Sequence, residues 1–129
     1  MRTASVVLGA TAVAFAGLDL AHKAITEATH LHPRSAAYVA VALALAVLWS
    51  AAILAARSAL IALAGGVVLG GAVGNLVSLA LWAGVPNPIE LEQVAFNLAD
   101  AFVLLGFGAT AAATLVFALV NRERLGEPL

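Results

Sequence analysis

The stretch GGAVGNLVSLALWAG, residues 70–84, decides the fold, because it is a run of apolar and small residues that carries one amide and one hydroxyl. It belongs to an apolar segment, residues 59–83, that meets the roughly 20 residues a helix needs to cross a bilayer. Three similar segments occupy residues 4–21, 36–56 and 94–120. They lack the alternation of barrel strands, and backbone groups in lipid must be paired internally. The sequence therefore predicts an all-α integral membrane protein, one domain over residues 1–129 folded as a four-transmembrane-helix bundle.

The composition supports a membrane protein and excludes other classes. Hydrophobic residues make up 64% of the 129 residues, charged residues make up 10%, and the mean hydropathy is +1.07. A water-soluble domain of this size could not bury so much apolar surface. The basic residues are scattered in a chain of net charge −1, so we expect no nucleic-acid partner. There is no cysteine, and the histidines at 22, 30 and 32 lack a fixed ligand spacing, so we predict no metal site and no cofactor.

The basic residues also predict the orientation in the membrane. Four fall on one side of the predicted spans and two on the other: Arg2, Arg57, Arg122 and Arg124 against Lys23 and Arg34. Because cytoplasmic loops carry an excess of Lys and Arg, we expect both termini in the cytoplasm. The loops at residues 22–35 and 84–93 then face outward.

Glycines in the third span predict how the helices pack. Gly66, Gly70 and Gly74 recur every fourth residue, which puts them on one helix face. Small residues at this spacing let another helix approach closely, so we expect the third span to be the central helix of the bundle. The alternative is that these glycines face lipid and pack against nothing.

Polar side chains within the spans are the candidate functional residues, since an ionisable group near the bilayer centre costs at least ~2.5 kcal/mol. Asp19 and Lys23 are four residues apart on one helix face. At the helical rise, Asn75 lies about 12 Å and Asp100 about 9 Å from the outward ends of their spans. Asn97 shares a face with Asp100. We expect these five side chains to meet in one outward-facing cavity.

Simpler interpretations of these residues stay open. Asn97 and Asp100 are residue types that favour a helix N-terminus, where they satisfy free backbone donors. Asp19 and Lys23 can form an ion pair at the membrane interface, with the lysine extended toward the headgroups.

Two strings resemble the motifs of a known family: Gly70-Gly71-Ala72-Val73-Gly74-Asn75-Leu76 and Phe96-Asn97-Leu98-Ala99-Asp100. Together with Asp19 and Lys23, they are similar in order along the chain to lipoprotein signal peptidase (signal peptidase II), an intramembrane aspartic protease of four helices. The resemblance implies a multi-pass protein of the bacterial plasma membrane. In that family, two aspartates activate a water that cleaves a lipoprotein precursor before its lipidated cysteine. One carboxylate accepts a proton while the other donates one. Asp100 matches one of the two.

The chain departs from the family at the other aspartate. The family's Gly-Val-Val-Asp-Phe segment reads here Gly84-Val85-Pro86-Asn87-Pro88, so Asn87 holds the catalytic position, and an amide cannot exchange a proton at neutral pH. The Asp and Arg of the family's GNLxDR motif are Ser78 and Leu79. The family's Asn-x-Gly-Ala segment, part of a β cradle, is replaced by residues 21–35, so we expect no cradle. Glu90, three residues after Asn87, is the candidate substitute carboxylate.

Three functions follow from these observations. The leading hypothesis is a catalytically impaired relative that binds a lipidated peptide, a lipid or a partner helix in the outward-facing cavity, whose expected floor is Asn75, Asn97, Asp100 and Asn87. The second is an active prolipoprotein signal peptidase that uses Asp100 with Glu90. The third is an accessory subunit whose glycine face docks on a larger membrane complex. The expected partners are membrane lipid, a lipoprotein precursor or a partner membrane protein.

Overall fold

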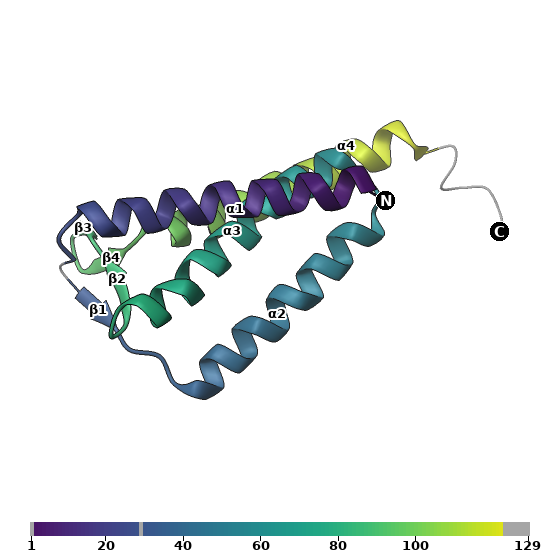
Figure 1. Ribbon diagram of the computed structural model, residues 1–129. Coiled ribbons are helices and arrows are strands. Elements are labelled where there is room, and N and C mark those ends of the chain that lie inside the picture. The colour runs from purple at the N-terminus through teal and green to yellow at the C-terminus, as the bar shows by residue number, and fades with distance from the viewer. Residues whose placement is uncertain (1, 29, 123–129) are drawn as a thin grey trace.

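The computed structural model describes residues 2–28 and 30–122, in which four long helices form the body of the molecule (Figure 1). Each helix is long and apolar enough to cross a membrane. The prediction of an all-α membrane bundle is confirmed, and the chain is a multi-pass membrane protein. The helices are α1 (Arg2–Ile25), α2 (Ala36–Ala55), α3 (Ala59–Leu81) and α4 (Leu98–Val120).

Helix α3 is the centre of the bundle, because α1 and α4 pack along most of its length. Helix α2 packs against α3 much less, and in Figure 1 it diverges from the other three helices toward one end. A short turn, residues 56–58, joins α2 to α3 at the opposite end, and Ile53 beside this turn is the one buried residue of α2. The free part of α2 exposes apolar side chains, which suits contact with lipid.

The close approach of α1 to α3 depends on glycines that have no side chain. A Cβ atom built on Gly66, Gly70 or Gly74 would overlap α1, because it would lie within 2.7 Å of an α1 atom. The nearest atoms are Thr11 Cβ at 2.6 Å, Phe15 Cβ at 2.7 Å and Asp19 Oδ2 at 2.6 Å, respectively. These glycines therefore form one continuous face of α3, and α1 covers it.

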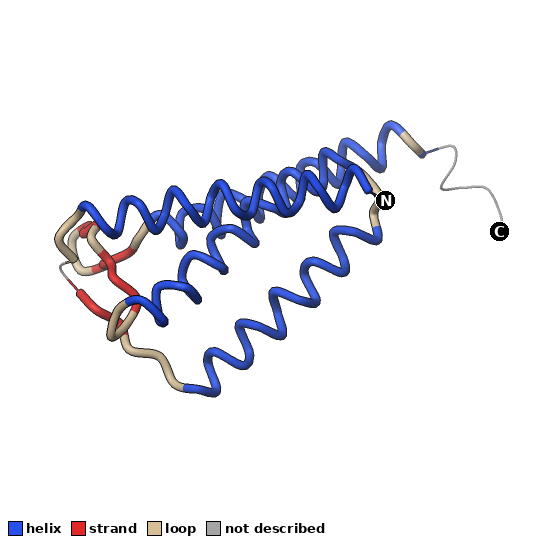
Figure 2. Tube along the Cα trace, viewed as in Figure 1, coloured by secondary structure: helices blue, strands red, loops and turns tan. Residues whose placement is uncertain are grey.

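Four short strands cap one end of the bundle, here called the strand end (Figure 2). They are β1 (His30–His32), β2 (Val85–Asn87), β3 (Ile89–Leu91) and β4 (Val94–Phe96), and β1 pairs antiparallel with β2, and β3 with β4. We expect no β cradle from residues 21–35, but these residues do contribute one strand, β1, to the cap. Strand β1 finds its partner in the loop after α3, so the pairing depends on how the helices bring two distant loops together.

The fourth helix begins later than the sequence predicted. Residues 94–96 form β4, and α4 starts at Leu98 after the cap residue Asn97. The prediction failed because a short apolar run suits a buried strand as well as a helix. Asp100 therefore lies in the first turn of α4, about 3 Å of helical rise from Leu98 rather than about 9 Å. The other predicted span limits differ from the helices by at most four residues, at the end of α1.

The basic residues lie at the two ends of the bundle in the arrangement from which the membrane orientation is predicted. Arg2, Arg57 and Arg122 lie at the end opposite the strands, whereas Lys23 and Arg34 lie at the strand end. The remaining basic residue of that argument, at position 124, lies outside the described residues. The cytoplasmic location of the termini stays a prediction.

We expect Gly70→Ala to lower the free energy of unfolding by about 1–3 kcal/mol, as overpacking in a close-packed contact does. The added methyl group would lie 2.7 Å from Phe15 Cβ and 2.9 Å from the carbonyl oxygen of Ala12. The control is Gly17→Ala, because a Cβ on Gly17 meets no atom within 4 Å. Thermal unfolding of both variants in one detergent measures the difference, and equal stability would contradict this packing of α1 on α3.

Candidate functional site

Lys23 of α1 is the centre of a buried polar cluster at the strand end. The residue is 3% exposed as a whole, and the side chains of Lys23 and Asp19 are both fully buried. Lys23 Nζ donates to Asp19 Oδ2 at 2.7 Å, to Asn75 Oδ1 at 2.9 Å and to Ser78 Oγ at 2.9 Å. An ammonium group has three N–H donors, so all are used. The lysine therefore does not extend toward the headgroups, and it ties α1 to α3.

Asp19 connects the same cluster to α4. Its second carboxylate oxygen, Oδ1, accepts a hydrogen bond from the backbone N–H of Ala99 at 2.8 Å. Ala99 lies in the first turn of α4, where backbone N–H groups have no partner within the helix. A negative charge is also favourable at this end of the helix dipole. One carboxylate thus neutralises Lys23 and completes the start of α4.

The hydrogen bonds of Asn75 explain why this amide lies inside the apolar stretch of α3. Its Oδ1 accepts from Lys23, and its Nδ2 donates to Asp100 Oδ1 at 3.0 Å. A side chain that must accept from a cation and donate to a carboxylate needs both halves of an amide. Ser78, the other polar residue in this stretch, accepts from Lys23 and donates to the carbonyl of Gly74 at 2.7 Å.

Asn97 and Asp100 form a capping box at the start of α4. Asn97 Oδ1 accepts from the Asp100 N–H at 3.1 Å, and Asp100 Oδ2 accepts from the Asn97 N–H at 3.2 Å. The helix-end interpretation is therefore correct for both residues. Asp100 does more than cap the helix, because its side chain also accepts a hydrogen bond from Asn75 and remains exposed.

Asn87, at the family's catalytic position, is 5% exposed and lies on β2. Its Oδ1 accepts from Asn97 Nδ2 at 2.7 Å. Its Nδ2 donates to the carbonyl of Ala95 at 3.1 Å and lies 3.0 Å from His32 Nδ1. This amide nitrogen thus donates to β4 and also contacts the imidazole ring of His32 on β1. Asn87 therefore joins both pairs of strands to the cap of α4.

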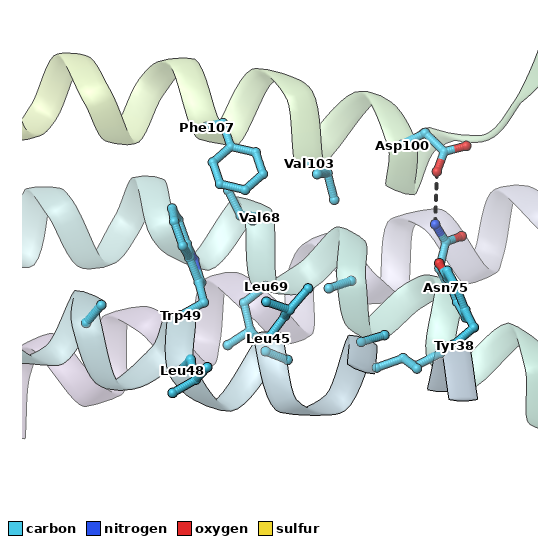
Figure 3. A pocket seen from close by; sticks show the side chains of 15 residues that line it. Tyr38, Leu45, Leu48, Trp49, Val68, Leu69, Asn75, Asp100, Val103 and Phe107 are labelled. Carbon is cyan, nitrogen blue, oxygen red and sulfur yellow. Dashed lines mark hydrogen bonds between the residues drawn. The ribbon is translucent and has the colours of Figure 1, made fainter. Parts of the chain in front are cut away.

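An apolar cavity of about 640 Å³ lies between α2, α3 and α4 (Figure 3). Its polar residues, Tyr38, Asn75 and Asp100, gather at one end, and the rings of Trp49 and Phe107 lie at the other. These rings meet edge to face with centroids 4.9 Å apart, and Trp49 Nε1 donates to the carbonyl of Gly65 at 3.0 Å. The volume falls within the roughly 300–1,000 Å³ of small-molecule sites. Trp49 is therefore part of the cavity wall.

The five expected cavity residues are brought together, but they do not all line the cavity. Asn75 and Asp100 line it, whereas Asp19, Lys23 and Asn97 are buried behind them. Of the residues expected on the cavity floor, Asn75 and Asp100 line the cavity, whereas Asn97 and Asn87 do not. Side chains behind a cavity wall and side chains in it have the same spacing along a helix, so the sequence could not separate them.

Glu90 lies apart from Asp100. It is exposed on β3 and lines a separate polar hollow of about 460 Å³ with His30, His32 and Gln93. Asp100 is the one acidic residue of the described part of the chain that lines the larger cavity. No group of three or more His, Cys, Asp or Glu side chains in residues 2–28 and 30–122 is arranged to hold a metal ion.

Lys23→Met is expected to lower the free energy of unfolding by about 3–5 kcal/mol, because it leaves the Asp19 carboxylate buried without its cation. Adding Asp19→Asn should recover part of the loss, since an amide oxygen can still accept from the Ala99 N–H. Unfolding in mixed micelles of the wild type, both single variants and the double variant gives the coupling energy, expected at about 0.5–3 kcal/mol. Strictly additive losses would contradict a direct contact between the two charges.

Comparison with known protein families agrees with the motifs and the geometry. Residues 24–116, well over half of the chain, match the family model of signal peptidase (SPase) II. The match begins directly after Lys23 and includes Asn75, Asn87, Asn97 and Asp100. A search of curated proteins finds no match. With its four membrane-spanning helices and the motif residues gathered at one end of them, this chain belongs to the signal peptidase II family.

Proposed function

We propose that this family member is catalytically impaired and that it holds a membrane amphiphile, a lipid or a lipid-modified peptide, in the cavity between α2, α3 and α4. One observation carries the proposal. Within the described residues, Asp100 is the single acidic side chain that lines the cavity, and the position of the family's second aspartate holds Asn87.

Hydrolysis by this family's chemistry requires a second carboxylate. One acid must be ionised to take a proton from water while the other is protonated to give one, and an amide can do neither. The Asn87 amide is moreover engaged by Ala95 and Asn97. Glu90 lines the other hollow, which argues against its use as the substitute acid.

Binding requires only the features that the chain retains. The cavity has hydrogen-bonding groups at one end and a long apolar body, which is the division of chemistry in an amphiphile (Figure 3). The polar end is held in place by the Lys23 cluster, so little freedom is lost when a ligand binds there. We place the protein in the plasma membrane of a bacterium with its strand end outward, where family substrates are cleaved.

We expect no maturation of a lipoprotein precursor by this chain. The test co-expresses it with a diacylglyceryl-modified precursor in a bacterium depleted of its own signal peptidase II, and gel mobility reports cleavage. An intact signal peptidase II is the positive control, and membrane extraction verifies insertion of the chain.

Cleavage that disappears in Asp100→Asn would overturn the proposal. Its disappearance also in Glu90→Gln would then identify the altered dyad as the active one.

A cavity-filling variant tests binding itself. Ala42→Trp places an indole in the cavity from α2, and we expect it to reduce the phospholipid retained on the purified protein by roughly tenfold, the effect of losing 1.4 kcal/mol of binding free energy. Ala44→Trp, on the exposed side of the same helix, is the matched control and should retain lipid as the wild type does. Native mass spectrometry counts the bound phospholipids, and equal retention in the two variants would exclude the cavity as the binding site.

A further inference from the structure

The polar end of the cavity selects one class of amphiphile, an inference that rests on the proposed binding function. We infer that the cavity binds a phospholipid with a primary ammonium headgroup, phosphatidylethanolamine, with the ammonium group at Asp100 and one acyl chain in the apolar body of the cavity.

The cavity wall carries a net negative charge at its polar end. Lys23 and Asp19 neutralise each other in the one ion pair of the described residues, and all three donors of Lys23 are used. Asp100 accepts from two neutral donors, the Asn75 side chain and the Asn97 N–H. A carboxylate has about four acceptor positions, so capacity remains on its exposed side. The cavity therefore presents one uncompensated negative charge, which favours a cationic group with N–H donors.

The apolar lining of the cavity favours a lipid over an extended peptide. An extended peptide inside an apolar cavity, unlike a helix, needs outside partners for its backbone N–H and C=O groups along its whole length. The cavity offers polar groups only at the end formed by Tyr38, Asn75 and Asp100, because the indole N–H of Trp49 is already bonded to Gly65. The remaining lining is hydrocarbon. An acyl chain needs no hydrogen-bond partner, so it matches this lining and an extended peptide does not.

A positive group, the guanidinium of Arg34, lies beside the same end of the cavity. The guanidinium carbon of Arg34 lies 4.8 Å from the centroid of the Tyr38 ring, and Tyr38 lines the cavity. Arg34 is exposed, so its donors are accessible to a phosphate. A cationic group, Arg34, therefore lies beside Tyr38, which lines the same cavity as the anionic Asp100. Phosphatidylethanolamine carries the complementary pair, an ammonium group and a phosphate separated by two carbons.

The test measures phospholipid affinity of the delipidated full-length chain by native mass spectrometry. The probes are phosphatidylethanolamine, phosphatidylcholine and phosphatidylglycerol with identical acyl chains. We expect wild-type protein to bind phosphatidylethanolamine at least roughly tenfold more tightly than the other two, a difference of about 1.4 kcal/mol. Phosphatidylcholine is the informative comparison, because its ammonium is fully methylated and has no N–H donor. This comparison needs no variant, so it holds even if a substitution impairs folding.

Variants assign the preference to Asp100. Asp100→Asn should lower affinity for phosphatidylethanolamine to that for phosphatidylcholine, while Glu27→Gln, which removes an exposed charge outside the cavity, should keep the preference. Arg34→Gln should weaken all three lipids alike. Equal affinities in the wild type, a preference that survives Asp100→Asn, or a diacylated lipopeptide that phosphatidylethanolamine cannot displace would overturn the inference but leave the proposed function. Absence of any bound lipid or lipopeptide would overturn the proposed function itself.

Discussion

The structure depends on the buried ammonium group of Lys23. A charge removed from water costs several kcal/mol unless it is paired and fully hydrogen-bonded, so its acceptors must be held in place. Lys23 takes them from two helices, Asp19 on its own α1 and Asn75 and Ser78 on α3. Asp19 in turn accepts a hydrogen bond from the backbone N–H of Ala99 at the start of α4. Satisfying one cation therefore fixes how three helices meet at the strand end.

The differences from the family motif preserve this balance. The family's acidic and basic residues in GNLxDR are replaced by Ser78 and Leu79, so one negative and one positive charge are lost together. The Ser78 hydroxyl accepts a hydrogen bond from Lys23 and donates its own to the carbonyl of Gly74 in α3. Leu79 needs no partner. The hydrogen bonds of Lys23 are therefore satisfied without these two charges, which agrees with the proposal that the protein binds an amphiphile without cleaving it.

Asn87 and the cavity illustrate two consequences of that scaffold. The amide of Asn87 joins the strands to the cap of α4, so the residue that matches the family's second aspartate takes part in the structure of this cap. Helix α2, in contrast, is held to α3 mainly near their common turn. The cavity exists because α1, α3 and α4 form a closely packed unit while α2 stands away from it (Figure 1).

The sequence by itself determined the four spans, the glycine face of α3 and the shared helix face of Asp19 and Lys23, because hydrophobic length and residue spacing are local properties of a helix. It did not determine the pairing of β1 with β2, the start of α4 after β4, or the division between residues that line the cavity and residues behind it. It also could not place Glu90 in a separate hollow. Only the tertiary structure decided the β1–β2 pairing, the lining of the cavity and the place of Glu90, because these depend on contacts between segments far apart in the chain that local spacing does not encode. The start of α4 is set locally by the β3–β4 hairpin and the capping box, and the apolar run of residues 94–96 concealed it.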